Sequence, residues 1–432
     1  MFVRKNRCLG PLWILPFIFW LHSAANRSSA DEVPSQKAVL GDRIIARAQI
    51  LELQDNSQLG LNADGQTTSI AYQDFCRIGV HTAPTRFPIA LLTDGSYLSF
   101  TAIERHKNQF ILQTSLWENI SIPESLLRAV ILAPTGSADA WYSLLDRVST
   151  ATGRNDQLLL SSRGWTEGIL QWPESSGEIL QPDRSQTLRI NNEDAQFEVK
   201  EIEAIVFSPI LTPLTNTKSP GRIGWKDGSL FACSQWRVTQ PGDFVEMTLR
   251  CGVVLKSLDQ PAAVASAIAS LTNRPKSVSF LSDMEASSYK HVDWLTSKWP
   301  LANDRDVYGR RLMVSQDTSR RGIVEKGLAM HATSQAAYRW DKSAGQFLST
   351  VTLALPMERG STSPGQAIVK ILGLKNGKLE TLYTSPVLTS QTAPLDISVS
   401  LEGIELIVLM VDAGPGGTLG DHILWLDSRI HK

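Results

Sequence analysis

The chain has 432 residues, in which 42 lysines and arginines stand against 43 aspartates and glutamates. This near-neutral balance supplies no basic surface for a phosphate backbone, so the composition argues against a nucleic-acid-binding protein. The length suits two to four ordinary domains, and a hydrophobic content of 42% is typical of a globular protein.

The N-terminal segment has the order of an export signal. A positive segment at 4–7 precedes an apolar stretch at 9–21, and small residues follow up to Ala30. A membrane anchor is the alternative, but prolines interrupt the apolar stretch, which is also short for a span. We therefore expect residues 1–30 to be a signal peptide and the mature protein to be secreted or periplasmic, with no remaining membrane span.

The next part of the chain alternates short apolar runs with turn residues, a pattern typical of strands in small antiparallel sheets. Similar stretches end in the apolar segments 129–134 and 204–209, which suggests a repeat. We predict an N-terminal β-unit followed by three β-repeats, each a small barrel or half-sandwich. These units span residues 31–81, 82–153, 154–221 and 222–278.

Few helices are expected in this part. Apolar residues recur at helical spacing in 139–148, and the Ala-rich segment 261–271 begins with a proline, which suits a first helical turn. We predict both as connector helices. The proline-containing stretch 209–220 is predicted to be a linker between two units.

Three cysteines, Cys76, Cys233 and Cys251, remain after signal removal. Cys233 and Cys251 each lie nine residues from Gly242, in the predicted hairpin turn 240–243, and this symmetry makes them a disulfide candidate in an oxidising compartment. Two buried free thiols are an equally supported alternative. No paired-cysteine or histidine motif accompanies them, so no metal is predicted there.

Three sequence blocks mark the C-terminal part: SDME at 282–285, KGLAMHA at 326–332 and DHILWLD at 421–427. In this order they resemble the NPCBM/NEW2 module, the carbohydrate-binding domain attached to family 98 glycoside hydrolases, over residues 279–432. The order of β-units before such a module also resembles exported proteins of planctomycete-type bacteria.

The resemblance implies a galactose-binding-like β-sandwich of the jelly-roll type, so the whole chain is predicted to be mainly β. The residues agree, because an Asn376–Gly377 hairpin turn lies among strand-length apolar segments. These segments are 346–355, 366–372, 380–382, 395–401 and 405–411.

The resemblance also implies binding residues, of which His331, Asp421, His422 and Trp425 are the most typical of the family. A sugar needs an aromatic platform and hydrogen-bonding groups, and these residue types provide both. The alternative is that Trp425 belongs to the core of the last strand, and that Asp421 and His422 only hold its preceding loop.

A second aromatic group precedes them and has two interpretations. It either lines a binding groove or caps the sandwich against the third β-repeat, and the second interpretation is favoured. Its members are Tyr289, His291, Trp294, Trp299 and Tyr308.

Asp283 and Glu285 would share one face of a strand, but glycoside hydrolysis needs two carboxylates about 5–9 Å apart across a cleft. A solvated role or contact with a structural calcium ion suits them better. No catalytic motif and no cofactor motif is found, and no stretch is free for a catalytic barrel. We therefore predict a non-catalytic exported protein that binds a galactose-type or cell-surface glycan. The alternative is a cell-envelope scaffold that binds proteins and no sugar.

Overall fold

The computed structural model describes residues 36–84, 88–132, 137–161, 164–172, 187–190, 195–215, 221–239, 244–292, 298–315, 321–340, 345–355 and 365–432. The predicted signal peptide, the turn at 240–243 and Trp294 lie outside the described residues. Within these ranges, no helix combines the length and the apolarity needed to cross a membrane.

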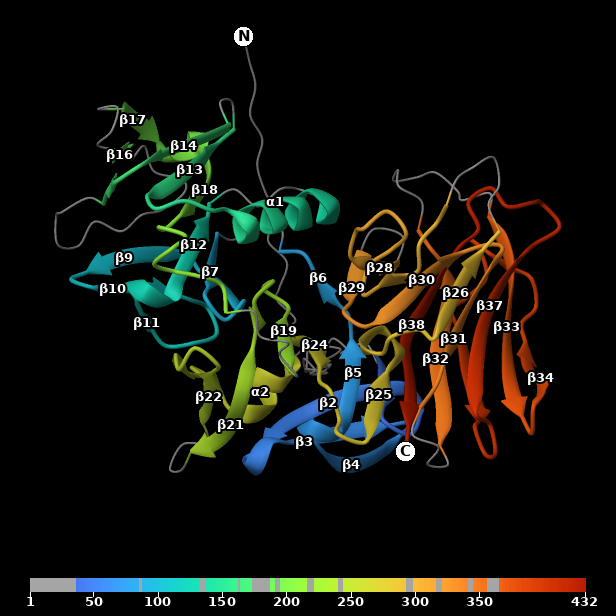
Figure 1. The fold of residues 1–432 in the computed structure, drawn as a ribbon. Coiled ribbons are helices and arrows are strands. Elements are labelled where there is room, and N and C mark those ends of the chain that lie inside the picture. Colours follow the sequence, from blue (N-terminus) through green and yellow to red (C-terminus); the bar gives the residue numbers. More distant parts are fainter. Residues whose placement is uncertain are drawn as a thin grey trace, which may run out of the picture. The chain divides into compact units, whose positions relative to one another are not determined.

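Antiparallel strands build the first part, as predicted (Figure 1). The first unit has β1 Gln36–Leu40, β2 Ile44–Gln54, β3 Gln58–Ala63, β4 Gln66–Ala71 and β5 Phe75–Gly79. The second has β7 Ile89–Leu92, β8 Tyr97–Ser99, β9 Ala102–His106, β10 Gln109–Gln113, β11 Ile120–Pro123 and β12 Leu127–Ile131. The third has β13 Asp156–Leu160, β14 Gly164–Gly168, β15 Leu170–Gln171, β16 Thr187–Ile190, β17 Ala195–Glu198 and β18 Ile202–Val206. The fourth has β19 Arg222–Trp225, β20 Leu230–Phe231, β21 Cys233–Thr239, β22 Phe244–Leu249, β23 Val254–Lys256 and β24 Ile268–Thr272.

The four units are joined by hydrogen bonds. In each unit the first strand pairs with the last, giving the pairs β1–β5, β7–β12, β13–β18 and β19–β24. These pairs continue into one another in a 14-stranded sheet. The strands β9 to β11 form a separate three-stranded sheet, as do β15 to β17 and β21 to β23. One apolar cluster, which runs from Ala38 to Leu271, contains side chains from every unit. The predicted unit boundaries stay predictions.

In the part of the chain that the structure describes, two α-helices accompany the strands, α1 Ala138–Thr150 and α2 Pro261–Ser266. The side chain of Ser137 accepts a hydrogen bond from the Ala140 N–H and caps α1, whose buried face packs against the strands. The predicted helix 261–271 is too long, because Ile268–Thr272 is strand β24. The β-branched Ile268 and its apolar neighbours pair with β19 in the sheet, and this tertiary pairing outweighs the helical preference of the alanines before them.

The predicted Cys233–Cys251 disulfide is wrong in this structure, where both cysteines are free. Strand register explains why, since β21 pairs with β22 so that Leu249 lies opposite Cys233. Cys251 comes after the end of β22, in the turn toward β23, where its N–H donates to Asp94 (3.0 Å). Equal distances from a turn in sequence therefore did not give opposite positions across the strands.

The C-terminal part is a sandwich of two antiparallel sheets, as predicted. One sheet has β25 Val278–Phe280, β27 Ala302–Asn303, β30 Gly327–His331, β32 Gln346–Leu353, β36 Leu395–Ser400 and β38 His422–His431. The other has β26 Ser288–His291, β31 Ser334–Tyr338, β33 Gln366–Lys375, β34 Lys378–Thr384, β35 Leu388–Thr389 and β37 Leu406–Ala413. Asn376 and Gly377 both have positive φ (49° and 75°) between β33 and β34, which confirms the predicted hairpin turn.

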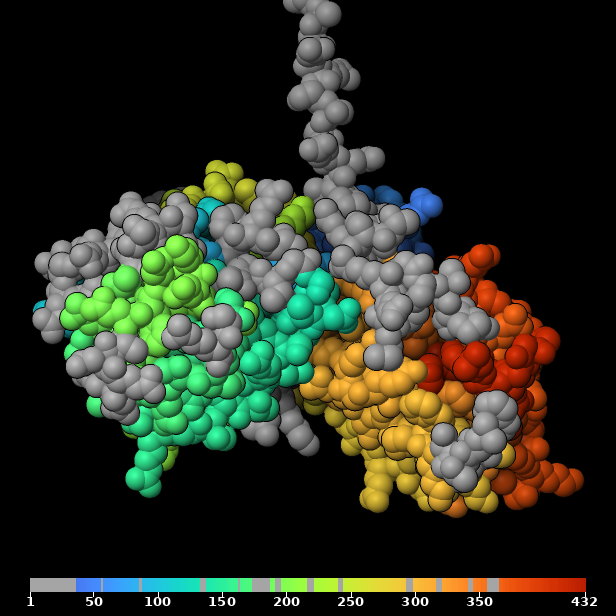
Figure 2. Space-filling view, turned by 90° about the horizontal axis from the view of Figure 1, so that it is seen from above, coloured from blue at the N-terminus to red at the C-terminus, as the bar shows by residue number. Residues whose placement is uncertain are grey.

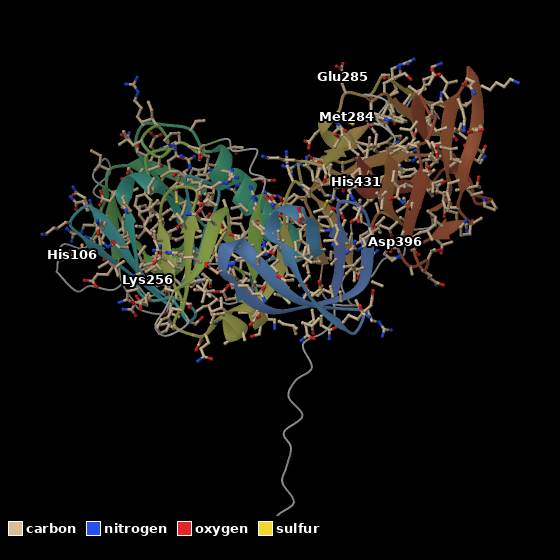
Figure 3. The ribbon with its side chains drawn as sticks, turned by 90° about the horizontal axis from the view of Figure 1, so that it is seen from below. His106, Lys256, Met284, Glu285, Asp396 and His431 are labelled. Carbon is tan, nitrogen blue, oxygen red and sulfur yellow. The ribbon has the colours of Figure 1, made fainter. Side chains whose placement is uncertain are left out.

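The sandwich is continuous with the first unit. Strands β28 Leu312–Ser315 and β29 Arg321–Val324 form a sheet with β6 His81–Thr82. Beside β5, Arg77 forms a buried ion pair with Asp427 (2.8 Å), and Arg429 donates to the Gly41 carbonyl (3.1 Å). Figure 3 shows Asp396 next to the blue first strands, where it forms an ion pair with Lys37.

Helix α1 also contacts this region. Asp146 pairs with Arg311 (2.9 Å) and Asp139 pairs with Arg321 (3.4 Å). In Figure 2 the teal surface of α1 accordingly adjoins the orange surface of the residues that precede and form β28 and β29. The connector helix therefore contacts both the strands of its own unit and the C-terminal part.

Candidate functional site

Two histidines meet at one end of the sandwich. His331 ends β30, His422 begins β38, and these antiparallel strands pair so that the two residues lie directly opposite each other. Their ring centroids are 4.7 Å apart, and the side chains are buried, with 7% and 8% of their surface exposed. Strand pairing therefore places two imidazoles side by side just below the surface.

Aromatic rings cover this histidine pair. The Trp299 ring stacks on His331 (centroid distance 5.1 Å, interplanar angle 14°) and meets His422 with its edge (5.1 Å). Tyr308 packs against Trp299 (5.6 Å), and a hydrogen bond of 2.8 Å joins its hydroxyl to Nε2 of His422. His291, at the end of β26 in the other sheet, lies 3.5 Å from His331 through its ring nitrogen. These five residues form what we call the aromatic–histidine cluster.

The cluster is open to solvent on its aromatic side. Tyr308 is 46% exposed, Trp299 and His291 are half-buried, and the two opposed histidines lie beneath them. The Tyr289 hydroxyl donates to the Trp299 carbonyl (2.9 Å) and holds the tryptophan backbone. The site is thus a partly exposed aromatic surface above buried, polar rings.

A short loop fixes the exposed tyrosine. The buried Asp306 carboxylate accepts hydrogen bonds from the N–H groups of Tyr308 and Arg310 (2.9 Å each) and forms an ion pair with the Arg310 guanidinium (2.6 Å). That guanidinium lies 5.3 Å from the Tyr308 ring centroid, at cation–π distance. The loop is therefore ordered before a ligand arrives, which lowers the entropic cost of binding.

The two opposed histidines are neutral near pH 7. Burial, with smaller contributions from the neighbouring His331 and Arg310, lowers the pKa of His422 to about 4. Burial also lowers the pKa of His331, with a smaller effect of His291 in the same direction. A neutral imidazole offers one donor and one acceptor, so the buried floor of the cluster can hydrogen-bond without carrying charge.

The depressed pKa of His422 predicts a pH dependence of stability. The unfolded chain protonates this residue below its ordinary pKa of 6.5, whereas the folded chain does so only near 4. The free energy of unfolding should therefore fall as the pH drops through this window. His422→Gln should remove that part of the fall, which urea unfolding between about pH 7 and about pH 4 would measure.

Comparison of the wild type with this variant cancels other titrating groups. Asp421 acts in the opposite sense, because burial raises its pKa to about 6 and the folded form then binds a proton more tightly than the unfolded chain. It is present in both proteins, so its contribution drops out. Equal pH slopes for wild type and His422→Gln would contradict the assignment.

Asp421 and Trp425 occupy different places from the exposed platform that the sequence suggested. Asp421 is 1% exposed, and its Oδ1 accepts the Gln366 N–H (2.6 Å), so it holds the first residue of β33. Trp425 is fully buried between the sheets, opposite Leu328 of β30. A stacking role for Trp425 is therefore wrong in this structure, because a sugar cannot reach a ring without exposed surface.

The sequence indicated all five residues of the cluster, but it did not predict that they lie together. His331 and His422 were predicted from one motif set, and His291, Trp299 and Tyr308 from a separate aromatic group. The structure brings all five together. The signal that could have linked them is positional, since each histidine stands at an end of a strand, β26, β30 or β38, and strand ends meet at one edge of a sandwich.

The predicted carboxylate pair has another arrangement. Asp283 ends a 3₁₀ turn, Leu281–Asp283, so it does not share a strand face with the exposed Glu285 (Figure 3). Asp283 instead accepts from the buried Lys326 ammonium (2.7 Å), which also pairs with Asp304 (2.5 Å). In the described part of the chain, no group of three or more His, Cys, Asp or Glu side chains is arranged to hold a metal ion. Structural calcium stays a prediction.

Comparison with known proteins identifies the C-terminal part. Residues 277–431 match the family model of the NPCBM/NEW2 domain, which confirms the resemblance. No curated protein matches the chain at a significant level.

Several solved structures are similar to parts of the chain. CBM51 from Clostridium perfringens GH95, in complex with methyl-galactose, is 18% identical and covers 35% of this chain and 99% of its own, with a TM-score of 0.30. The tandem CBM51 modules of the family 98 glycoside hydrolase from Streptococcus pneumoniae SP3-BS71 are 13% identical, covering 64% and 87%, with a TM-score of 0.31. CBM51-2 with the INT domains of Clostridium perfringens ZmpB, in complex with GlcNAc, is 15% identical, covering 49% and 43%, with a TM-score of 0.31. At these scores the likenesses do not establish a shared ligand.

Proposed function

Proceeding from the NPCBM/NEW2 domain at residues 277–431, we propose that this protein binds carbohydrate at the aromatic–histidine cluster and does not catalyse a reaction there. The ligand class is a galactose-type or cell-surface glycan. The observation that carries the proposal is the stacking of Trp299 over the His331–His422 pair, with Tyr308 hydrogen-bonded to His422.

The chemistry of the cluster suits a sugar ring. The C–H face of a sugar packs on an aromatic ring, and its hydroxyls need donors and acceptors at the ring's edge. Tyr308 and Trp299 supply partly exposed aromatic surface, and His291 supplies a half-buried polar ring beside them. Because burial keeps His331 and His422 neutral, the site favours an uncharged ligand such as a neutral sugar.

The nearby carboxylates support a non-catalytic role. Asp306 is bound to Arg310 and to two backbone N–H groups, and Asp421 accepts the Gln366 N–H. Glycoside hydrolysis by the usual route needs two carboxyl groups facing one another across the scissile bond. The two acidic side chains named here instead hold loops in place, so we infer binding without bond cleavage.

Glycan-array binding by the full chain tests this proposal. Trp299→Ala should weaken glycan binding by roughly tenfold to hundredfold, because it removes the stacking surface. Tyr308→Ala should act in the same direction. Trp165→Ala is a matched control, since Trp165 is 39% exposed on β14 and belongs to the first part of the chain.

Thermal melts separate a lost site from a lost fold. The proposal requires the two site variants to melt close to the wild type while losing glycan binding. Trp165→Ala should keep both properties. A folded wild-type chain that binds no glycan on the array would overturn the proposal and favour the envelope scaffold instead.

We further propose that the protein is exported. The support is the positive segment 4–7 followed by the apolar stretch 9–21. Cleavage should leave a mature N-terminus between Ala25 and Asp31, which N-terminal sequencing of the native protein would detect. Recovery of an intact Met1 in a membrane fraction would count against export.

A further inference from the structure

A cavity lies far from the cluster in sequence, between the second and third units. It has a volume of about 740 Å³, within the usual range of about 300–1,000 Å³ for small-molecule sites. Residues of β9, β10 and β11 line one side, and Ile169 with Leu170 of β15 lines another. Among the described residues, every one that lines the cavity lies outside the 277–431 domain.

Aromatic rings and aliphatic side chains form the apolar surface of this cavity. Phe110 meets Trp172 edge-on (5.1 Å between centroids) and lies 5.2 Å from Phe207. Ile169 is 58% exposed and Leu211 is 72% exposed, although both line the cavity. Folding has therefore left two large apolar side chains in water at the edge of an aromatic-lined hollow, as is common where a ligand or partner binds.

Three charged side chains of the lining already have hydrogen-bonding or ionic partners. Arg105 forms an ion pair with Glu124 at the rim. Asp156 accepts hydrogen bonds from the N–H groups of Leu170 (3.0 Å) and Ser208 (2.9 Å). An anion would find Arg105 already paired and the Asp156 carboxylate in the same lining, whereas the Arg105–Glu124 pair presents both a donor and an acceptor to a neutral polar group.

We infer that this cavity is a second binding site, for an uncharged and largely apolar small molecule carrying one hydroxyl or amide group. The apolar body would pack against Phe207, Ile169 and Leu211, above a floor formed by the largely buried rings of Phe110 and Trp172. The polar group would hydrogen-bond to the Arg105–Glu124 pair. This site is independent of the proposed sugar site, because it lies in the other part of the chain.

Fluorescent dyes of matched size test the inference on the full chain. The neutral probe N-phenyl-1-naphthylamine should bind at a single saturable site, more tightly than the anionic 1-anilinonaphthalene-8-sulfonate. Ile169→Glu and Leu211→Glu should each weaken neutral-dye binding by about tenfold or more, because a charge would replace apolar contact at the cavity edge.

The chain offers matched controls for both substitutions. Leu379→Glu and Leu419→Glu change residues that are 56% and 71% exposed, close to Ile169 and Leu211, but in the sandwich. Both should leave dye affinity unchanged. Tighter binding of the anionic dye, equal losses in the controls, or no saturable binding would overturn the inference.

Thiol protection locates the probe. Ser125 lines the cavity and is exposed, so Ser125→Cys should react with iodoacetamide, and bound neutral dye should slow that reaction severalfold. In protein without residues 1–30, and therefore without Cys8, the native thiols should react slowly, since burial raises the pKa of Cys76, Cys233 and Cys251 to about 12. Ser266→Cys in α2 is the control, and its protection to the same extent would contradict binding in the cavity.

Discussion

Replacing Asp427 by asparagine is expected to destabilise the protein by about 3–5 kcal/mol, because it leaves a buried arginine without its counter-charge. Asp427 and Arg77 are 4% and 6% exposed at the side chain, and Oδ2 of Asp427 lies 2.8 Å from the guanidinium. Asparagine also tolerates the positive φ of this position (49°), so the substitution removes the charge without adding backbone strain.

Urea unfolding followed by tryptophan fluorescence would measure this loss. Asp42→Asn is the control, because Asp42 pairs with Arg43 at 3.0 Å while both side chains are about half exposed (48% and 59%). An exposed pair contributes at most about 1 kcal/mol, so the control should stay near the wild type. Equal effects of the two substitutions would show that Asp427 does not act through a buried ion pair.

The second large effect separates two tryptophans of the sandwich. Trp425→Ala is expected to cost about 3–5 kcal/mol of stability, since the ring is fully buried and its removal leaves a cavity between the sheets. Trp299 is only half-buried, so Trp299→Ala should cost clearly less. Trp425→Ala should therefore mainly reduce stability, whereas Trp299→Ala should mainly reduce glycan binding.

Differential scanning calorimetry with glycan titration would test this separation. Trp425→Phe is the conservative control, because it keeps an aromatic ring between the sheets and should recover most of the stability. If folded Trp425→Phe lost glycan binding while Trp299→Ala kept it, the assignment of Trp299 to the site and of Trp425 to the core would be reversed.

Several strands of the sandwich were predictable because each of these had a sequence signal of its own. Apolar runs of strand length predicted β32, β33, β36 and β37, and the Asn376–Gly377 pair predicted the turn before β34. Such signals depend on neighbouring residues only. For the same reason, the capped and regularly spaced helix α1 was also predictable.

Features that depend on distant partners were not predictable. The segment Ile268–Thr272 becomes a strand because β19 and β5 pair with both of its edges. The register of β21 with β22 places Cys251 beyond the strand, which no count along the chain could reveal. The cluster likewise depends on residues from two loops and from strands of two sheets coming together. Its members could therefore be named from the sequence, but their grouping into one site could not.

The contacts between the first strands and the last determine whether the C-terminal domain is structurally complete by itself. A chain severed before Ser277 would keep every residue of the family match, yet Arg429, which is fully buried, would lose the Gly41 carbonyl that accepts from its Nε. Asp427 would lose Arg77, and β29 would lose β6 and become an open edge able to pair with another copy. The segment that matches the family model therefore does not form all of its buried contacts by itself in this protein. Residues from more than two hundred positions earlier complete it.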